Sequence, residues 1–169
     1  MDGRSRARLI ARERALVNAL AREHGGAAMT ETAIGTALSL LDFRNERKGE
    51  FVRLITEFET KIDRRLRALL LDLGYECRLR GWPKPMVVSL VRTPEENAAV
   101  GAKSQTHVDG RAADLRDRPD FSAAIVEYVN SWHGTGPQAC AYRHDAGNGL
   151  HFHLQVPRAG VVGADQKET

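Results

Sequence analysis

The sequence predicts an α+β fold, in which a small antiparallel sheet with flanking helices follows an N-terminal helical extension. Three observations lead to this prediction. Helical periodicity dominates the first 73 residues, short strand-like segments follow, and two further helical segments lie between those strands. This segregation of helices and strands along the chain is typical of α+β proteins. With 169 residues, of which 42% are hydrophobic and 28% charged, the chain is long enough to bury a core without disulfides.

Three helices are predicted before the first strand. Residues 5–23 carry leucine, isoleucine and valine at helical spacing, with arginine and glutamate between them. A second helix is expected over 30–42, with Thr30 as its N-cap. A polar connector then leads to the clearest helix, over 51–73, whose apolar residues form one continuous stripe. Gly74 is expected just beyond the end of that helix.

Short strands and two short helices are predicted after this point. Thr93, Pro94 and Glu96 have the spacing of an N-cap, a first-turn proline and a capping box, which predicts a helix there. Asp120 is expected to cap another helix, over 121–132. Alternating or β-branched residues predict strands at 75–80, 86–91, 112–115, 140–143 and 151–156.

The charge distribution and the helical pattern together divide the chain into three parts. Residues 1–24 hold six arginines and three acidic residues, and this net charge of +3 equals that of the whole chain. The basic character therefore belongs to the N-terminus, and we expect no nucleic-acid partner. We predict a helical extension over 1–48, a single domain over 49–160 and a flexible polar tail over 161–169. Residues 1–45 are candidates for helix-mediated self-association, and the oligomeric state is left open.

Membrane and secretion signals are not apparent in the sequence. The apolar runs are only a few residues long, against the roughly 20 that a membrane helix requires. Charged residues interrupt the N-terminus every few positions, so it has no apolar signal-peptide region. We therefore expect a cytoplasmic protein as synthesised, with no transmembrane segment. Its two cysteines, Cys77 and Cys140, make no disulfide framework.

Histidine and carboxylate residues gather in two segments of the last third. His151 and His153 are two residues apart in a predicted strand and therefore face the same side. His107 and Asp114 flank a glycine turn that can bring an imidazole and a carboxylate together. Such ligands suit Zn²⁺, and three of them leave a position open for catalysis. A histidine pair on a strand is, however, more often a structural or surface feature than a metal site.

Together the two segments resemble the M15 peptidases, the D-Ala-D-Ala metallopeptidase group within the LAS class of zinc peptidases. The resemblance covers roughly residues 75–157. The stretch Leu90–Asn97, which contains Arg92, is similar to an arginine-containing segment of that family. The family's HxH motif is matched by His151-Phe152-His153. Its SxHxxGxAxD motif is matched at every fixed position, by Ser104, His107, Gly110, Ala112 and Asp114.

This resemblance implies a site and an activity. His107, Asp114 and His153 would bind Zn²⁺. Arg92 would stabilise the oxyanion or hold a substrate carboxylate, and Ser104 would support the site through a hydrogen bond to the substrate or to the ligands' surroundings. The implied reaction is hydrolysis of an amide bond in peptidoglycan stem peptides. A phage endolysin-like member without a signal peptide would reach the wall after lysis-type release or as part of a phage particle.

The general base is where the sequence departs from the family. Many members carry Glu or Asp three residues before the last ligand histidine, and this chain has Leu150 there. The base is then His151 itself or another group, with His144 and Asp145 as the nearest candidates. An alternative function follows from the same departure, namely a catalytically inactive, zinc-stabilised module that binds cell-wall peptide or a protein partner. A base close to the open metal position would favour the enzyme.

Overall fold

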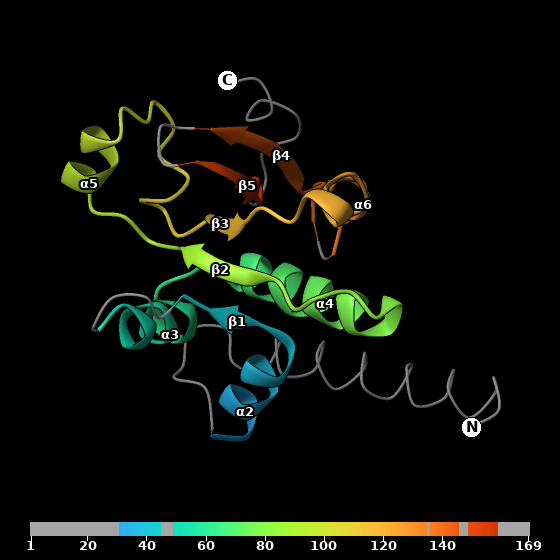
Figure 1. The fold of residues 1–169 in the computed structure, drawn as a ribbon. Helices are drawn as coiled ribbons and strands as arrows, with labels where there is room; N and C mark the ends of the chain where they lie inside the picture. The colour runs from blue at the N-terminus through green and yellow to red at the C-terminus, as the bar shows by residue number, and fades with distance from the viewer. Residues whose placement is uncertain (1–30, 45–48, 135, 146–148, 159–169) are drawn as a thin grey trace, which may run out of the picture.

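The structure is a computed structural model that describes residues 31–44, 49–134, 136–145 and 149–158 (Figure 1). It is an α+β fold with a five-stranded mixed sheet and flanking helices, which confirms the predicted fold class. The helix predicted over 5–23, the capping role of Thr30 and the tail over 161–169 lie outside the described residues. Among the helices that are described, none combines the length and hydropathy needed to cross a bilayer.

The sheet has the strand order β1-β2-β3-β5-β4. All neighbours pair antiparallel except β1, a two-residue strand that pairs parallel with β2 and makes the sheet mixed. The strands are β1 (Asp42–Phe43), β2 (Met86–Ser89), β3 (Ala112–Arg116), β4 (Cys140–Asp145) and β5 (Leu150–Gln155). The helices are α2 (Glu31–Leu40), α3 (Glu50–Thr60), α4 (Arg64–Arg80), α5 (Pro94–Ala99) and α6 (Ser122–Asn130).

The long helix predicted over 51–73 is in fact two helices, α3 and α4. Asp63 interrupts it with non-helical dihedral angles, and its carboxylate accepts a hydrogen bond from Arg65 N at 2.7 Å as the N-cap of α4. The apolar stripe is continuous across this break because both helices face the same core. The strand predicted over 75–80 is wrong, since α4 runs on to Arg80 and ends at Gly81, where φ is 70°.

The caps of the two later helices gave different outcomes. The capping box of α5 is confirmed, because Thr93 Oγ1 accepts from Glu96 N at 3.1 Å and Glu96 Oε2 accepts from Thr93 N at 2.8 Å. The prediction that Asp120 caps α6 is wrong. Asp120 lies inside a 3₁₀ turn over Pro119–Phe121, and α6 starts after it without a side-chain cap.

Gly74 lies within α4 because α2 packs closely against it. A Cβ atom at this position would lie 2.7 Å from the backbone oxygen of Leu40, so the two helices can approach this closely only at a glycine. We expect Gly74→Ala to lower the free energy of unfolding by about 1–3 kcal/mol, because the steric cost exceeds the gain of about 1 kcal/mol in helix propensity. Urea denaturation measures the change.

Gly35→Ala in α2 is the matched control for this prediction, since a Cβ there meets nothing within 4 Å. It should leave stability unchanged or raise it. If both variants behaved alike, close packing of α2 on α4 would not be the reason for the glycine at position 74.

One face of the sheet forms the hydrophobic core, and the other carries the polar residues of interest. Leu115 on β3 and Phe152 and Leu154 on β5 are buried in one cluster with the leucines of α4. Residues 31–43 contribute to that same cluster, although the sequence pattern assigns them to an extension over 1–48. Their buried side chains are Ala37, Leu40, Leu41 and Phe43.

Candidate metal centre

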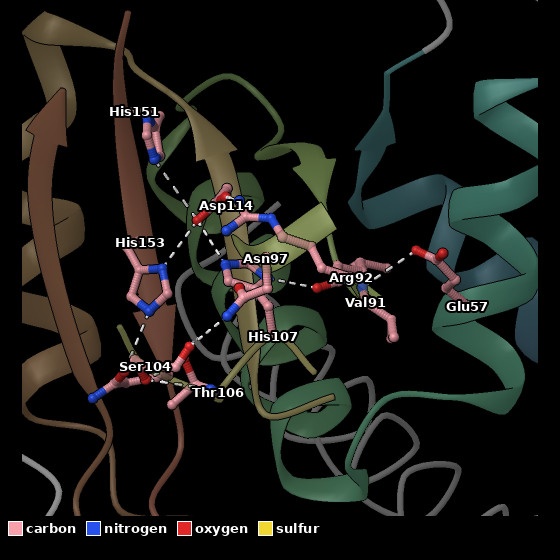
Figure 2. Close-up of polar contacts among 12 residues, drawn as sticks. Glu57, Val91, Arg92, Asn97, Ser104, Thr106, His107, Asp114, His151 and His153 are labelled. Carbon is pink, nitrogen blue, oxygen red and sulfur yellow. Dashed lines mark hydrogen bonds and ion pairs between the residues drawn. The ribbon is translucent and has the colours of Figure 1, made fainter. Parts of the chain in front are cut away.

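The three predicted metal ligands meet on the face of the sheet opposite the hydrophobic core (Figure 2). Asp114 on β3 pairs in register with His153 on β5, so their side chains lie next to each other. His107 reaches them from the loop that follows α5. His153 Nδ1 lies 3.0 Å from Asp114 Oδ1, and His107 Nε2 lies 3.1 Å from the same oxygen. Among the described residues, this is the single group of three such side chains whose ligand atoms lie within 4.8 Å of one another.

The protons on the two imidazoles are placed by hydrogen bonds on the far side of each ring. His107 Nδ1 donates to Leu90 O at 2.5 Å, and His153 Nε2 donates to Gln155 Oε1 at 3.2 Å. In a neutral form of either ring, the near nitrogen, His107 Nε2 or His153 Nδ1, therefore carries the lone pair. Both near nitrogens point at the same carboxylate oxygen of Asp114. Outer hydrogen bonds of this kind are what orient metal-binding histidines in proteins.

This arrangement fits a divalent metal ion. When both rings are neutral, three acceptor atoms converge, one each from His107, Asp114 and His153. They lack a positive partner, which either an added proton on each ring or one cation between them would supply. Ligands about 2.0–2.1 Å from a tetrahedral zinc ion are about 3.3 Å apart, close to the two separations found here. The three side chains are only 3–6% exposed, so water does not compete freely for them. The residues present could therefore hold a metal ion.

The Asp114 carboxyl is held in its charged form. Its burial opposes ionisation, but hydrogen bonds from His107 and His153, and the positive charge that these rings carry when protonated, outweigh burial and hold its pKa well below the usual range. Arg92 also pairs with Asp114, through Oδ2, the oxygen that faces away from the imidazoles. One oxygen of Asp114 is therefore available to a metal ion, and the other is neutralised by a guanidinium group.

Arg92 joins the site from the segment that follows β2. Its backbone N–H donates to His107 O at 3.4 Å, and its side chain remains 21% exposed. The guanidinium group thus contacts a ligand on one side and remains accessible on the other. This placement is compatible with both predicted roles, contact with an oxyanion and contact with a substrate carboxylate.

The backbone requires glycine at position 110, between His107 and Asp114 in the motif. Its φ of 68° lies in the left-handed region, and a Cβ there would lie 2.6 Å from Lys61 O. Gly110 O also accepts a hydrogen bond from Asp63 N at 2.8 Å. The ligand-bearing loop is therefore seated on the break between α3 and α4, at a position that tolerates no side chain.

His151 lies at the edge of the ligand cluster. Its Nδ1 donates to Gly149 O at 3.0 Å, so in the neutral ring the lone pair is on Nε2, which lies 3.8 Å from Asp114 Oδ1. Its side chain is 14% exposed. The ring therefore presents a proton acceptor to the site without occupying the position of a ligand.

The two other candidate bases lie on opposite faces of the sheet. His144 on β4 pairs in register with His151, and the centroids of their rings are 4.3 Å apart. Asp145 is the next residue along the strand and pairs with Leu150, so alternation places it on the other face. The structure brings His144 to the site and does not bring Asp145 there.

Ser104 lies in the loop that leads to His107. Its Oγ is 3.2 Å from Thr106 Oγ1 and accepts from Thr106 N at 3.3 Å, while its carbonyl accepts from the buried Asn97 Nδ2 at 2.9 Å. These contacts shape the loop before the first ligand. The hydrogen bond predicted for Ser104, to the substrate or to the ligands' surroundings, stays a prediction.

Sequence reasoning missed three contributors to the site. Gln155 and Leu90 O hold the imidazoles, and Tyr142 packs its ring 5.0 Å from that of His153. For Gln155 and Tyr142 a signal was present. Gln155 lies two residues after His153, and Tyr142 two before His144, so strand alternation places each on the ligand face. The carbonyl of Leu90 has no such sequence signal.

Glu57 on α3 is a buried carboxylate that supports the chain next to Arg92. Its Oε2 accepts a hydrogen bond from Val91 N at 3.3 Å (Figure 2). Burial raises the pKa of Glu57, despite the opposing charge of Arg53. The folded protein therefore holds this proton to higher pH than the unfolded chain does. Its contribution to stability is present at low pH and is lost as pH rises.

Glu57→Gln keeps an acceptor for Val91 N and removes the buried charge. We expect the variant to melt at a higher temperature than the wild type at neutral pH, and the two curves to converge near roughly pH 4, where the wild-type side chain is protonated. Thermal denaturation followed by circular dichroism measures this. Glu127→Gln, at an exposed position on α6, is the control. A gap that stays constant with pH would contradict the prediction.

Comparisons with known proteins do not assign this site. No protein-family model matches the chain, and no curated protein or solved structure matches it either. Its chemistry must therefore be argued from the residues and their geometry. On that basis His107, Asp114 and His153 form a candidate metal centre, with Arg92 and His151 beside it.

Proposed function

We propose that this protein is a zinc-dependent peptidase that hydrolyses an amide bond in peptidoglycan stem peptides. The observation that carries the proposal is the convergence of His107, Asp114 and His153, whose possible ligand atoms lie within 4.8 Å of one another while the outer nitrogens of both imidazoles are hydrogen-bonded. The substrate class is supported by the resemblance of the two histidine segments to M15 peptidases. A phage or prophage setting, with access to the wall after lysis-type release or from a particle, belongs to the same proposal.

His107, Asp114 and His153 would hold the zinc ion, and three protein ligands leave one coordination position open. When bound, zinc polarises a water molecule and the scissile carbonyl. Asp114 would use Oδ1 for this purpose, since its Oδ2 is paired with Arg92.

The remaining chemistry is assigned to His151 and Arg92. His151 keeps its proton on Nδ1 through Gly149 O, so Nε2 is the atom that accepts a proton from the attacking water. The same nitrogen then returns that proton to the leaving amine. Arg92 offers a permanent positive charge to the oxyanion or to a substrate carboxylate.

Metal analysis combined with peptidoglycan digestion tests this function. The purified protein should contain about one zinc ion per chain. It should release peptides from isolated sacculi, detected by mass spectrometry, and a chelator should stop the release until zinc is restored. His133→Ala, which removes an exposed histidine outside the site, is the control and should behave as the wild type. A protein without bound zinc would overturn the proposal.

A second function, a zinc-stabilised module that binds wall peptide or a protein partner, is favoured by one observation. Leu150 stands where many M15 peptidases carry their acidic base, and the structure leaves it 50% exposed at the start of β5. In the experiment above, this module would retain zinc and bind sacculi but release no peptides.

A further inference from the structure

One polar ring on the ligand face has no role in the chemistry described so far. His144 lies on β4 opposite His151, with their ring centroids 4.3 Å apart. Its ring is also 5.1 Å from that of Tyr142 and 6.0 Å from that of His153. His144 therefore belongs to the same cluster of rings as the proposed base and one of the ligands.

The Nε2 atom of His144 is buried, yet it has no hydrogen-bond partner among the described residues. Buried polar atoms in folded proteins are almost always paired, so an unpaired one requires an explanation. If the ring served only for packing, an apolar side chain at this position would avoid the cost of an unpaired buried nitrogen. A partner that arrives with the substrate accounts for the unpaired nitrogen.

The place of β4 in the sheet determines what that partner can be. β4 is an edge strand, paired on one side with β5 only. Tyr142 and His144 therefore form the side of the ligand face that lies beyond His153 and His151. A peptide bound over those two residues would pass His144. The polar groups it offers at regular intervals are main-chain amides.

We propose that His144 is a substrate-binding residue, whose Nε2 hydrogen-bonds to a main-chain amide of the bound peptide while its ring packs against His151. This inference rests on the proposed function and adds a subsite on the β4 side of the centre. It assigns His144 to binding and leaves proton transfer to His151.

Two substitutions separate the nitrogen from the ring. His144→Phe keeps an aromatic ring against His151 and removes the hydrogen bond, whereas His144→Gln keeps a polar group at a comparable reach. His133→Phe, at an exposed position, is the matched control. The probe is a synthetic stem pentapeptide with a fluorescent label. Its binding to the zinc-loaded protein is followed by anisotropy, and its cleavage by mass spectrometry.

We expect His144→Phe to weaken binding of the pentapeptide by about tenfold, as loss of one hydrogen bond predicts, with an equal rise in KM and little change in kcat. His144→Gln should recover part of the affinity. Zinc content should be unchanged in both variants, which shows that the ligands are intact. A kcat loss at unchanged KM, or wild-type binding by His144→Phe, would overturn the assignment.

The same experiment separates this inference from the proposed function. A wild-type protein that binds the pentapeptide without cleaving it would contradict the peptidase, while weaker binding by His144→Phe would still support the subsite. A wild-type protein that cleaves the peptide, together with a fully active His144→Phe variant, would overturn the subsite alone. If the wild-type protein neither binds nor cleaves the peptide, both are overturned.

Discussion

Replacing His107 by glutamine is expected to lower the affinity for zinc by more than about 100-fold. Loss of an outer hydrogen bond to a ligand typically costs 10–100-fold in metal affinity, and loss of a ligand atom should cost more. His107 is one of the three proposed protein ligands, and its side chain is only 3% exposed. Competition with a chromophoric zinc chelator measures the affinity.

Gln155→Leu provides a graded comparison for that measurement, because it removes only the hydrogen bond to His153 Nε2. Its affinity for zinc should fall between those of the wild type and His107→Gln. Because His107 is buried, the circular dichroism spectrum of each metal-free variant must match the wild type before affinities are compared. A well-folded His107→Gln protein with wild-type zinc affinity would contradict the centre.

Zinc binding should also raise the thermal stability of the wild type and fail to do so in His107→Gln. A ligand that binds only the folded protein raises the free energy of unfolding with the logarithm of the ratio of ligand concentration to Kd. The increase is about 2.7 kcal/mol at a concentration of 100 times Kd. This readout does not depend on catalysis. It therefore applies equally to the peptidase and to the binding module.

His151→Ala is expected to reduce peptide hydrolysis by about 10²–10⁴-fold while zinc remains bound, the range that a general base contributes. The physical reason is the position of Nε2, which lies 3.8 Å from Asp114 Oδ1 and carries the lone pair of the neutral ring, since Nδ1 donates to Gly149 O. The measurement is the initial rate of cleavage of a stem peptide, with zinc content determined on the same sample.

Two controls separate loss of the base from damage to the site. Added imidazole should restore part of the activity of His151→Ala, because it can occupy the cavity left by the ring and accept the proton. His133→Ala should retain full activity, since it removes an exposed histidine that is not part of the candidate metal centre. An active His151→Ala protein with full zinc occupancy would show that another group accepts the proton.

Local sequence patterns predicted much of the fold. They failed where contacts between segments distant in the sequence determine the local structure. The capping box at Thr93 and the strands carrying Asp114 and His153 depend on neighbouring residues and were predicted correctly. The end of the long helix was not, because a glycine reads locally as a stop signal. Gly74 instead accommodates the backbone at Leu40, a contact across more than 30 residues that periodicity does not contain.

For the site, the sequence by itself determined the kinds of ligand and the shared face of His151 and His153, because strand alternation is a local property. Only the tertiary structure decided which groups meet. The β3–β5 register brings Asp114 beside His153, Leu90 O and Gln155 direct the lone pairs, and the β4–β5 register includes His144 and excludes Asp145. A shift of one residue between strands would exchange the two faces, and such registers are set by the packing of the whole core.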